Sequence, residues 1–592
     1  MAALNALPLS GGIIDATDLH GPQDWTTPII ITKPVTLRLP CTRLLAKNAN
    51  LIITPPHGSG RLVGVDVGGC GQATEIVTTG GPGYRNRVIR ILGNYSPTLI
   101  VPPVGPTATG SSIAGSTIIR AVSDQIPSGG HDGFLETLKI GDSITVVGAS
   151  LRSPNGMVSP VVALNRNEIV LAREVPITVK TAYLRLSIGG YRLPVTLGSI
   201  NALSNQLVVG DAGNFAVGDM VRVVGAGPKG ADLFSSVAAA SDNELMLQSN
   251  ATLTVVNQIV QYATLAGQTT LSTASVSDAS DVLPGDWIHI GEWMNYAANN
   301  SDWNRMEWKQ IAQVNGTKLI FSEPLQASYG HSAFPGANGC PVFWRKVTGL
   351  IERTRIHDLS ISSVDGVSAI GVEAQNGRLL EVDHVGVNLR KGLGFFTVNQ
   401  QGAFIHDNSC GSERCADFGG LTDSRVQNNT FRNVGEGPVA ILELGSARNV
   451  VRDNQFLNAD NNHENPYVAA LGGSGIDSNT IEANVVSATH RASCFSILGG
   501  SANIIRGNKC TGGIAGVVIQ DWPAPDPARI AANNVVAGNV LRNSKIGIDV
   551  ISTLTTRAAR NLNSVQGNDT DSSVVIPLRL FGTTSVETRT TP

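Results

Sequence analysis

The sequence has few charged and few aromatic residues. Charged side chains make up 15% of the 592 residues and aromatic side chains 5%. The 43 basic and 46 acidic residues give a formal net charge of -3, and no basic run is present. The chain therefore lacks the electrostatic footprint needed to bind nucleic acid or an anionic membrane. No apolar run approaches the roughly 20 residues that span a bilayer, so we expect no nucleic-acid or membrane partner.

Export and metal-binding signals are also missing. The N-terminal stretch "MAALNALPLSGG" has neither a basic start nor a long apolar segment, so no secretory signal is recognisable. The seven cysteines are odd in number and show no paired metal spacing. We therefore expect no disulfide framework, no metal site and no cofactor. Cys410 and Cys510 are expected to be buried thiols that behave as small hydrophobes.

Glycine and β-forming residues are abundant instead. The chain contains 65 Gly and 29 Pro but only 6 Met, with many Val, Ile, Ser, Thr and Asn residues. This composition favours an all-β protein. In residues 1–115, short apolar runs such as "RVIRILGNY" (87–95) alternate with Gly and Pro. We interpret this segment as a β-rich start or cap of the main fold.

A repeat built around Gly-Asp fills residues 116–340. Gly-Asp before alternating apolar residues is typical of a turn that leads into a half-buried strand. A catalytic or metal-binding pair is the alternative, but the same turn position recurs three times. We therefore predict three small β-modules of common descent. Their turn segments are "LKIGDSITVVGA" (138–149), "FAVGDMVRVVGA" (215–226) and "VLPGDWIHIGEW" (282–293).

A different repeat covers residues 341–570. An apolar residue, two free positions, an asparagine and another apolar position return every 21 to 31 residues, with a second apolar strand between copies. Asparagine tolerates the left-handed conformation and bonds neighbouring backbone, so stacked copies would form a hydrogen-bonded ladder at a bend. Such a period indicates a solenoid. The asparagines are Asn408, Asn429, Asn454, Asn484, Asn508, Asn539 and Asn568.

These asparagine-punctuated coils resemble the right-handed parallel β-helix of the pectate-lyase-like superfamily, which includes polysaccharide lyases, polygalacturonases and phage tailspike depolymerases. The resemblance covers about 345–570, with 1–115 as a plausible start, and it leaves 571–592 as a closing strand and tail. The β-modules before the helix and the missing export signal make a tailspike the nearest class. That resemblance implies a polysaccharide substrate, a homotrimer, and an extracellular or virion-associated location. The characteristic motifs of polygalacturonases and mannuronan epimerases are absent, so no residue is carried over from them.

Carboxylates on the outer face of the helix are the candidate catalytic groups. Adjacent coils lie about 4.8 Å apart, so outward side chains form a row suited to an extended polymer. We expect Asp417 and Glu443 on neighbouring coils, with Glu436 in the loop before the second strand. One carboxyl would protonate the leaving oxygen, and the other would activate water or attack. The alternative is that these residues only solvate the surface. The expected outward row is Glu373, Thr397, Asp417, Glu443, Ser496, Gln520 and Asp549.

Loop residues supply the candidate substrate contacts. His463 and Glu464 lie in the polar loop "NADNNHENP", which is otherwise a plain surface loop. Arg491 could pair with a substrate carboxylate or with Glu464. The Trp-rich stretch 285–308 contains Trp293 and Trp303, whose rings would stack on sugars or pin the loop as a small core. Trp522, at the rim of a later coil, has the same possible role.

Three functions fit these features. The first is a glycoside hydrolase that cleaves a bacterial or extracellular polysaccharide. The second is a polysaccharide lyase on the same fold, which would leave an unsaturated sugar. The third is a non-enzymatic adhesin or structural fibre that retains glycan without cleaving it.

Overall fold

The structure is a computed structural model. It describes residues 2–47, 49–56, 60–79, 86–96, 107–123, 143–146, 157–165, 168–171, 174–176, 178–186, 191–192, 195–210, 212, 215–272, 279, 282–293, 303–329, 342–433, 439–443, 445–459, 469–474, 476–488, 492–521, 531–552, 562–582 and 585–589. The chain divides into two compact units. The helix unit comprises residues 1–94, 348–524 and 528–592, and the module unit comprises 95–347 and 525–527.

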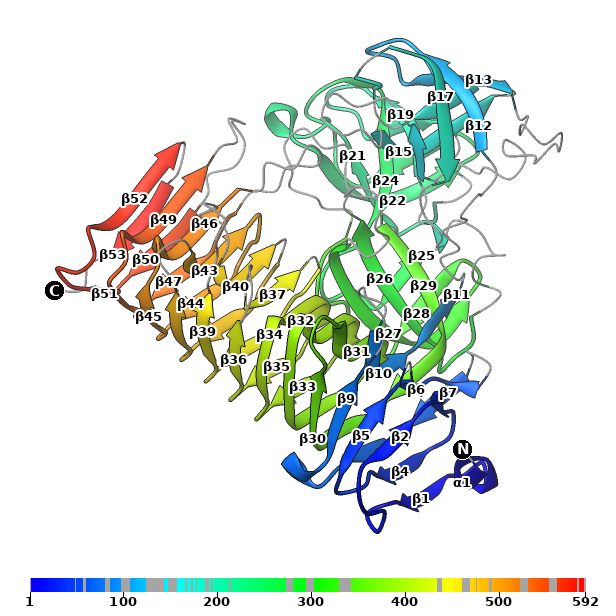
Figure 1. Cartoon of the computed structure of the whole chain (residues 1–592). Coiled ribbons are helices and arrows are strands. Elements are labelled where there is room, and N and C mark those ends of the chain that lie inside the picture. Colours follow the sequence, from blue (N-terminus) through cyan, green and yellow to red (C-terminus); the bar gives the residue numbers. More distant parts are fainter. Residues whose placement is uncertain are drawn as a thin grey trace. The chain divides into compact units, whose positions relative to one another are not determined.

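The helix unit is a right-handed parallel β-helix, and the predicted all-β fold with inserted modules is confirmed (Figure 1). Each strand pairs in parallel with its counterpart on the next coil, so one face of the coil forms a continuous ladder. Successive strands of this ladder are β30 (Arg355–Ser363), β32 (Glu381–Gln401), β33 (Phe404–His406), β35 (Arg425–Gln427), β38 (Val450–Arg452) and β41 (Thr480–Glu482).

Residues 1–94 build the first coils of the same helix. Strands β1 (Gly12–Asp15), β4 (Val35–Arg38) and β8 (Val65–Gly68) pair in parallel, and β8 pairs in turn with β30. The chain therefore leaves the helix after Asn94 and returns to it at Thr348. Gly93 and Gly349 lie close together, since a Cβ atom built on Gly93 would be 2.8 Å from the Gly349 carbonyl oxygen.

The module unit contains two closed six-stranded antiparallel barrels and a related sheet. The six strands of each barrel are numbered here by their order in the chain. Around both barrels, neighbouring strands follow the order first, second, fifth, fourth, third, sixth. The third sheet repeats the second to sixth positions of this order. Its strands are β25 (Thr270–Ser272), β26 (Trp287–Trp293), β27 (Trp303–Asn315), β28 (Lys318–Phe321) and β29 (Val342–Glu352).

The barrels are bounded as follows. The first comprises β12 (Thr107–Ser112), β13 (Ile118–Ser123), β14 (Ser143–Val146), β15 (Met157–Asn165), β16 (Glu168–Leu171) and β17 (Val179–Leu186). The second comprises β19 (Val195–Ile200), β20 (Gln206–Val209), β21 (Met220–Val223), β22 (Leu233–Ser241), β23 (Glu244–Leu247) and β24 (Val255–Ala263).

The Gly-Asp pairs have the turn role that the sequence predicts. Gly218 and Gly285 adopt φ values of 89° and 92°, a region that favours glycine. Asp219 and Asp286 each accept a 2.8 Å hydrogen bond from the backbone N–H three residues earlier. In these two modules the aspartate is therefore occupied in holding the turn. The third pair, at 141–142, lies outside the described residues.

The predicted asparagine ladder is present in the helix unit. From Asn408 to Asn539, each side-chain Nδ2 donates to a carbonyl group and to the Oδ1 of the asparagine one coil later, and that Oδ1 also accepts from the backbone N–H of the earlier asparagine. The left-handed residue, however, is the one before the asparagine. For example, Asp453 has φ 55°, while Asn454 has no positive φ. The asparagine is thus the buried hydrogen-bonding group, and its neighbour makes the bend.

A second ladder runs parallel to the first and was not predicted. It passes from Ser424 through asparagines on successive coils, with the same bonds between neighbours. Each of these asparagines stands five residues before a member of the first ladder, so each coil has two buried polar corners. The members after Ser424 are Asn449, Asn479, Asn503, Asn534 and Asn563.

The expectation of unpaired cysteines is wrong. The structure contains the disulfides Cys41–Cys70, Cys410–Cys415 and Cys494–Cys510. Cys410 and Cys510 are buried as expected, but each faces another inward cysteine. An odd count predicts only that one cysteine is left over, and that residue, Cys340, lies outside the described residues.

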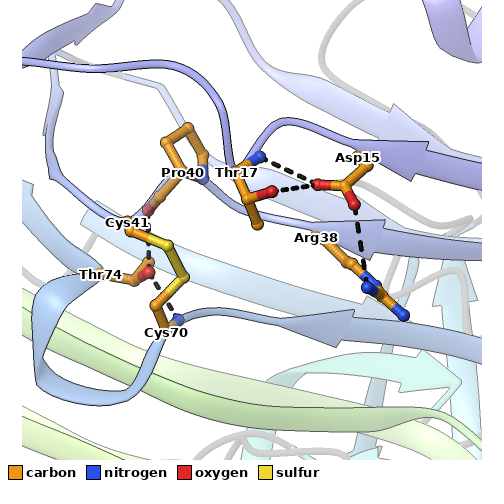
Figure 2. The surroundings of a disulfide bond; sticks show 7 residues. All are labelled: Asp15, Thr17, Arg38, Pro40, Cys41, Cys70 and Thr74. Carbon is orange, nitrogen blue, oxygen red and sulfur yellow. Dashed lines mark hydrogen bonds and ion pairs between the residues drawn. A yellow bond between two sulfur atoms is a disulfide. The ribbon is translucent and has the colours of Figure 1, made fainter.

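Figure 2 shows how the first disulfide joins successive coils. Cys41 follows β4 and Cys70 follows β8, the two strands that pair in parallel. The buried Thr74 hydroxyl accepts from the Cys70 N–H and donates to the Pro40 carbonyl group, both at 2.8 Å. The disulfide and the hydroxyl therefore fix the same pair of turns.

Candidate active site

One sheet of the helix unit carries the candidate catalytic residues, and we call it the site sheet. Its strands stack in parallel, one per coil, so that side chains at one register position form a row. The strands are β10 (Asn86–Leu92), β31 (Ser368–Arg378), the second half of β32, β34 (Ser409–Thr422), β37 (Ala440–Glu443), β40 (Ala469–Ser474), β43 (Ser493–Leu498), β46 (Ala515–Gln520), β49 (Ile546–Ser552) and β52 (Ile576–Gly582).

Asp417 and Glu443 lie on the outer side of this sheet. Their neighbours Phe418 and Leu442 are fully buried in the core, so alternation directs the two carboxylates outward. Asp417 pairs with Ile441, and Glu443 lies two residues further along β37. The two backbones are therefore diagonal neighbours, roughly 8 Å apart for strands about 4.8 Å apart with a 3.3 Å rise.

Arg414 completes the group. Its Nη1 donates a 2.7 Å hydrogen bond to Asp417 Oδ2 from three residues earlier in β34. Asp417 is nearly buried, with 7% of its surface exposed, while Glu443 and Arg414 are partly exposed. The site is thus a cation and two carboxyls, sheltered from water but reachable from the outer side.

The two carboxyls differ in how strongly they hold a proton. Burial raises the pKa of Asp417, and the charge and hydrogen bond of Arg414 oppose that rise. Burial, followed by the charge of Asp417, raises the pKa of Glu443 to about 7, against the opposing charge of Arg414. Because Asp417 has the direct hydrogen bond to Arg414, it ionises first and Glu443 retains its proton up to neutral pH.

The rest of the expected outward row is partly as predicted. Thr397 is an exception: it pairs with the core residue Phe418, so its side chain points inward, and its assignment to the outer row was wrong. Asp549 is nearly buried and bonds Arg579 across the coils. Ser496 and Gln520 lie outward yet are 3% and 6% exposed. Ser496 Oγ and Gln520 Oε1 have no hydrogen-bond partner among the described residues.

Most of the predicted substrate contacts cannot be placed. Trp293 and Trp303 pair with each other in the register of β26 and β27, but the structure describes only their backbone. They belong to the module unit. The other predicted residues lie outside the described residues, namely Glu436, His463, Glu464, Arg491 and Trp522.

The sequence marks Arg414 only as an isolated candidate for the base of a lyase, and its hydrogen bond to Asp417 was not predicted. In "ERCAD" the arginine stands three residues before Asp417, a spacing that regular strand alternation would place on opposite faces of the sheet. Cys415 and Ala416 are both buried in the core, so the inward–outward alternation is interrupted between Arg414 and Asp417. The inward cysteine between two outward charges was the available signal.

A second charged cluster lies on β32 and β33, away from the site sheet strands. Oxygen or nitrogen atoms of Glu381, Asp383 and His406 lie within 4.8 Å of one another, an arrangement that could hold a metal ion. Arg355, however, donates to both Asp383 oxygens, at 2.8 and 2.7 Å. These bonds lower the pKa of Asp383 despite its burial. The guanidinium group thus supplies the positive charge that a cation would supply.

Among the described residues, the helices found are too short or too polar to cross a membrane. No protein-family model matches the chain, and no curated protein matches its sequence.

Several solved structures are similar in part. The tailspike protein gp49 of Pseudomonas phage LKA1 is 13% identical, with 56% of this chain and 60% of that chain aligned and a TM-score of 0.34. The gp54 tailspike of Acinetobacter baumannii bacteriophage AP22 is 13% identical over 55% and 65%, with a TM-score of 0.34. The mannuronan C-5 epimerase AlgE6 A-module of Azotobacter vinelandii is 18% identical over 41% and 74%, with a TM-score of 0.27.

The aligned part spans less than two thirds of either tailspike. The parallel β-helix of this chain is established by its own strand pairing. The solved structures found similar to it include phage tailspikes.

Proposed function

We propose that this chain acts on a polysaccharide as a glycoside hydrolase, with Glu443 as the proton donor and Asp417 as the second carboxylate. The observation that carries this proposal is the pairing of two outward, sheltered carboxyls on neighbouring coils with unequal tendencies to ionise. Glycoside hydrolysis needs one carboxyl that is protonated and one that is ionised at the working pH.

The geometry supports this division of roles. Glu443, with a pKa of about 7, can donate its proton to the glycosidic oxygen as the carbon–oxygen bond breaks. Asp417, bonded to Arg414, then attacks the anomeric carbon or takes the proton of the attacking water. Arg414 stabilises the ionised form of Asp417 and holds its orientation, so it is a positioning residue in this scheme.

The resemblance of the coils to tailspikes leads to three further proposals. The substrate is a bacterial or extracellular polysaccharide, the protein assembles as a homotrimer, and it works outside the cell or on a virion. We also retain Glu436, His463, Glu464, Arg491, Trp293, Trp303 and Trp522 as proposed contributors to substrate binding or catalysis.

A panel of bacterial polysaccharides, assayed for new reducing ends, tests the proposed activity. We expect Asp417→Asn and Glu443→Gln to lower the rate at least about 100-fold, the scale of a lost acid or base. Asp549→Asn is the matched control and should retain the rate. Asp549 is a carboxylate on the same sheet, and it is paired with Arg579. Wild-type rates in both Asp417 and Glu443 variants would remove this site.

The same panel separates the alternatives. A product that absorbs in the ultraviolet through an unsaturated sugar identifies a lyase. Glycan that is retained by the protein without new reducing ends identifies an adhesin or structural fibre.

A further inference from the structure

Two arginines of β10 converge on one buried carboxylate of the site sheet. Glu373 on β31 is 0% exposed, and Nε atoms of Arg87 and Arg90 both lie 2.8 Å from its Oε2. Gln375 donates to the other oxygen at 2.5 Å. One guanidinium would neutralise this carboxylate, so the group as a whole carries one excess positive charge.

The excess charge is accessible. The side chains of Arg87 and Arg90 are 32% and 26% exposed. Arg90 donates to Glu373 through Nε, whereas Arg87 Nε lies 2.8 Å from the same oxygen as an ion pair without a hydrogen bond. Among the described residues, no hydrogen bond involves the terminal Nη groups of either arginine. A guanidinium presents five N–H donors in a planar fork that matches a carboxylate or phosphate, so most of these donors remain open to a ligand.

The register places this arginine pair in the row of the catalytic carboxyls. Arg90 pairs with Glu373, Glu373 with Phe396, and Phe396 with Asp417. Glu373 and Asp417 are therefore two coils apart, roughly 10 Å at the ordinary strand spacing. Phe396, partly exposed between them, offers a ring face on which a sugar can stack.

We propose that Arg87 and Arg90 form an anion subsite and that the substrate is an acidic polysaccharide. A sugar chain that lies along the row would place a carboxylate or phosphate at the arginines, a sugar face on Phe396, and a glycosidic bond at Asp417 and Glu443. This inference rests on the proposed function for the position of the cleaved bond. The recognition of an anionic glycan by Arg87 and Arg90 stands on the charges alone.

Binding measured in the Glu443→Gln background separates the inference from the activity. The probes are the acidic polysaccharides of the panel, each paired with the same polymer after its carboxyl groups have been reduced to alcohols; phosphate-bearing polymers form a separate arm. We expect binding of the charged form and at least about tenfold weaker binding of the reduced form, the scale of a lost charge-assisted bond. A preference confined to phosphate polymers identifies phosphate as the anionic group.

Two variants with opposite expected signs test the arginines. Arg87→Gln should weaken binding of the charged polymer about tenfold and flatten its dependence on salt, because Arg90 still neutralises Glu373. Glu373→Gln removes the competing carboxylate and should strengthen binding. Arg452→Gln is the matched charge control, because it removes an exposed cation of β38, a strand outside the site sheet.

The proposed subsite is overturned if charged and reduced polymers bind equally, if the panel shows binding of uncharged glycans alone, or if Arg87→Gln behaves like Arg452→Gln. If Arg87 controls binding of acidic glycans and the protein with Glu443 intact cleaves none of them, the subsite stands and the proposed hydrolase activity fails. If the wild type cleaves only neutral glycans, the proposed hydrolase activity stands and the anion subsite fails.

Discussion

At the scale of single residues, Glu443 combines a functional role with a cost to stability. Its pKa rises from an ordinary value of 4.5 to about 7 because burial and the charge of Asp417 disfavour the carboxylate. A carboxyl whose pKa is higher in the folded than in the unfolded state opposes folding once it must ionise. The cost is absent below pH 4.5, grows between pH 4.5 and 7, and is complete above pH 7. Its upper limit is about 3 kcal/mol, from 1.36 kcal/mol per pKa unit.

Glu443→Gln should therefore stabilise the protein at alkaline pH while it removes activity. We expect the free energy of unfolding to increase by about 1–3 kcal/mol at pH 8.5 and to stay nearly unchanged at pH 4. Urea unfolding at the two pH values measures the difference. An equal effect at both pH values would show that the substitution acts through packing and not through ionisation.

At the scale of the structural element, the asparagine ladders hold the coils in register. The side chain of Asn454 is fully buried, and its Oδ1 accepts from the N–H and the Nδ2 of Asn429. Its Nδ2 donates to the Val426 carbonyl group and to Asn484 Oδ1. Buried backbone groups that water cannot reach are thus satisfied by one side chain of this ladder on each coil.

Asn454→Ala should lower the free energy of unfolding by about 3 kcal/mol, because it leaves the N–H of Asn429 and the carbonyl group of Val426 without partners. Asn568→Ala is the control, since this partly buried residue ends the ladder and should cost about half as much. Denaturant unfolding of both variants measures these costs. Equal losses would mean that position within the ladder has no influence.

The disulfides give an element-scale prediction for the first coils. Cys41 and Cys70 are 29 residues apart in sequence, so the bond restricts the unfolded chain. We expect Cys41→Ser/Cys70→Ser to lower the free energy of unfolding by about 3 kcal/mol, measured by denaturant unfolding.

In the wild type, three disulfides account for six of the seven cysteines, so denatured protein should show one reactive thiol before reduction and seven after it. Seven reactive thiols before reduction would restore the expectation of free cysteines.

At the scale of the whole molecule, the module unit is an insertion in a continuous solenoid. The strands before it pair directly with strands after it, as when β10 pairs with β31 and β8 with β30. The hydrophobic core of the helix unit likewise continues from residues before the insertion to residues after it. The helix thus has the contacts of a complete ladder within its own unit.

Replacement of residues 95–347 by a short Gly-Ser linker should leave a folded β-helix, because Gly93 and Gly349 already lie together. We expect cooperative unfolding and the β-sheet circular dichroism of the helix unit. Activity on the panel would then show whether the modules contribute to catalysis. Loss of cooperative unfolding would mean that the helix depends on the inserted unit.

The asparagine repeat predicted the solenoid because its cause is local: one buried amide per coil recurs at each bend. The second ladder was also visible in principle, since "NVVRDN", "NTIEAN" and "NIIRGN" each carry two asparagines five residues apart. Asp417 and Glu443 were predicted to face outward on neighbouring coils by strand alternation, and the register agrees.

The sequence by itself therefore determined the coil, its corners and the direction of the two carboxylates, because each depends on residues close together in the chain. Only the tertiary structure decided which cysteines meet, that Thr397 faces inward, and that Arg87 and Arg90 reach Glu373 from 283 or more residues away. Those facts depend on the register between coils. Loops of unequal length set that register, and no local pattern encodes it.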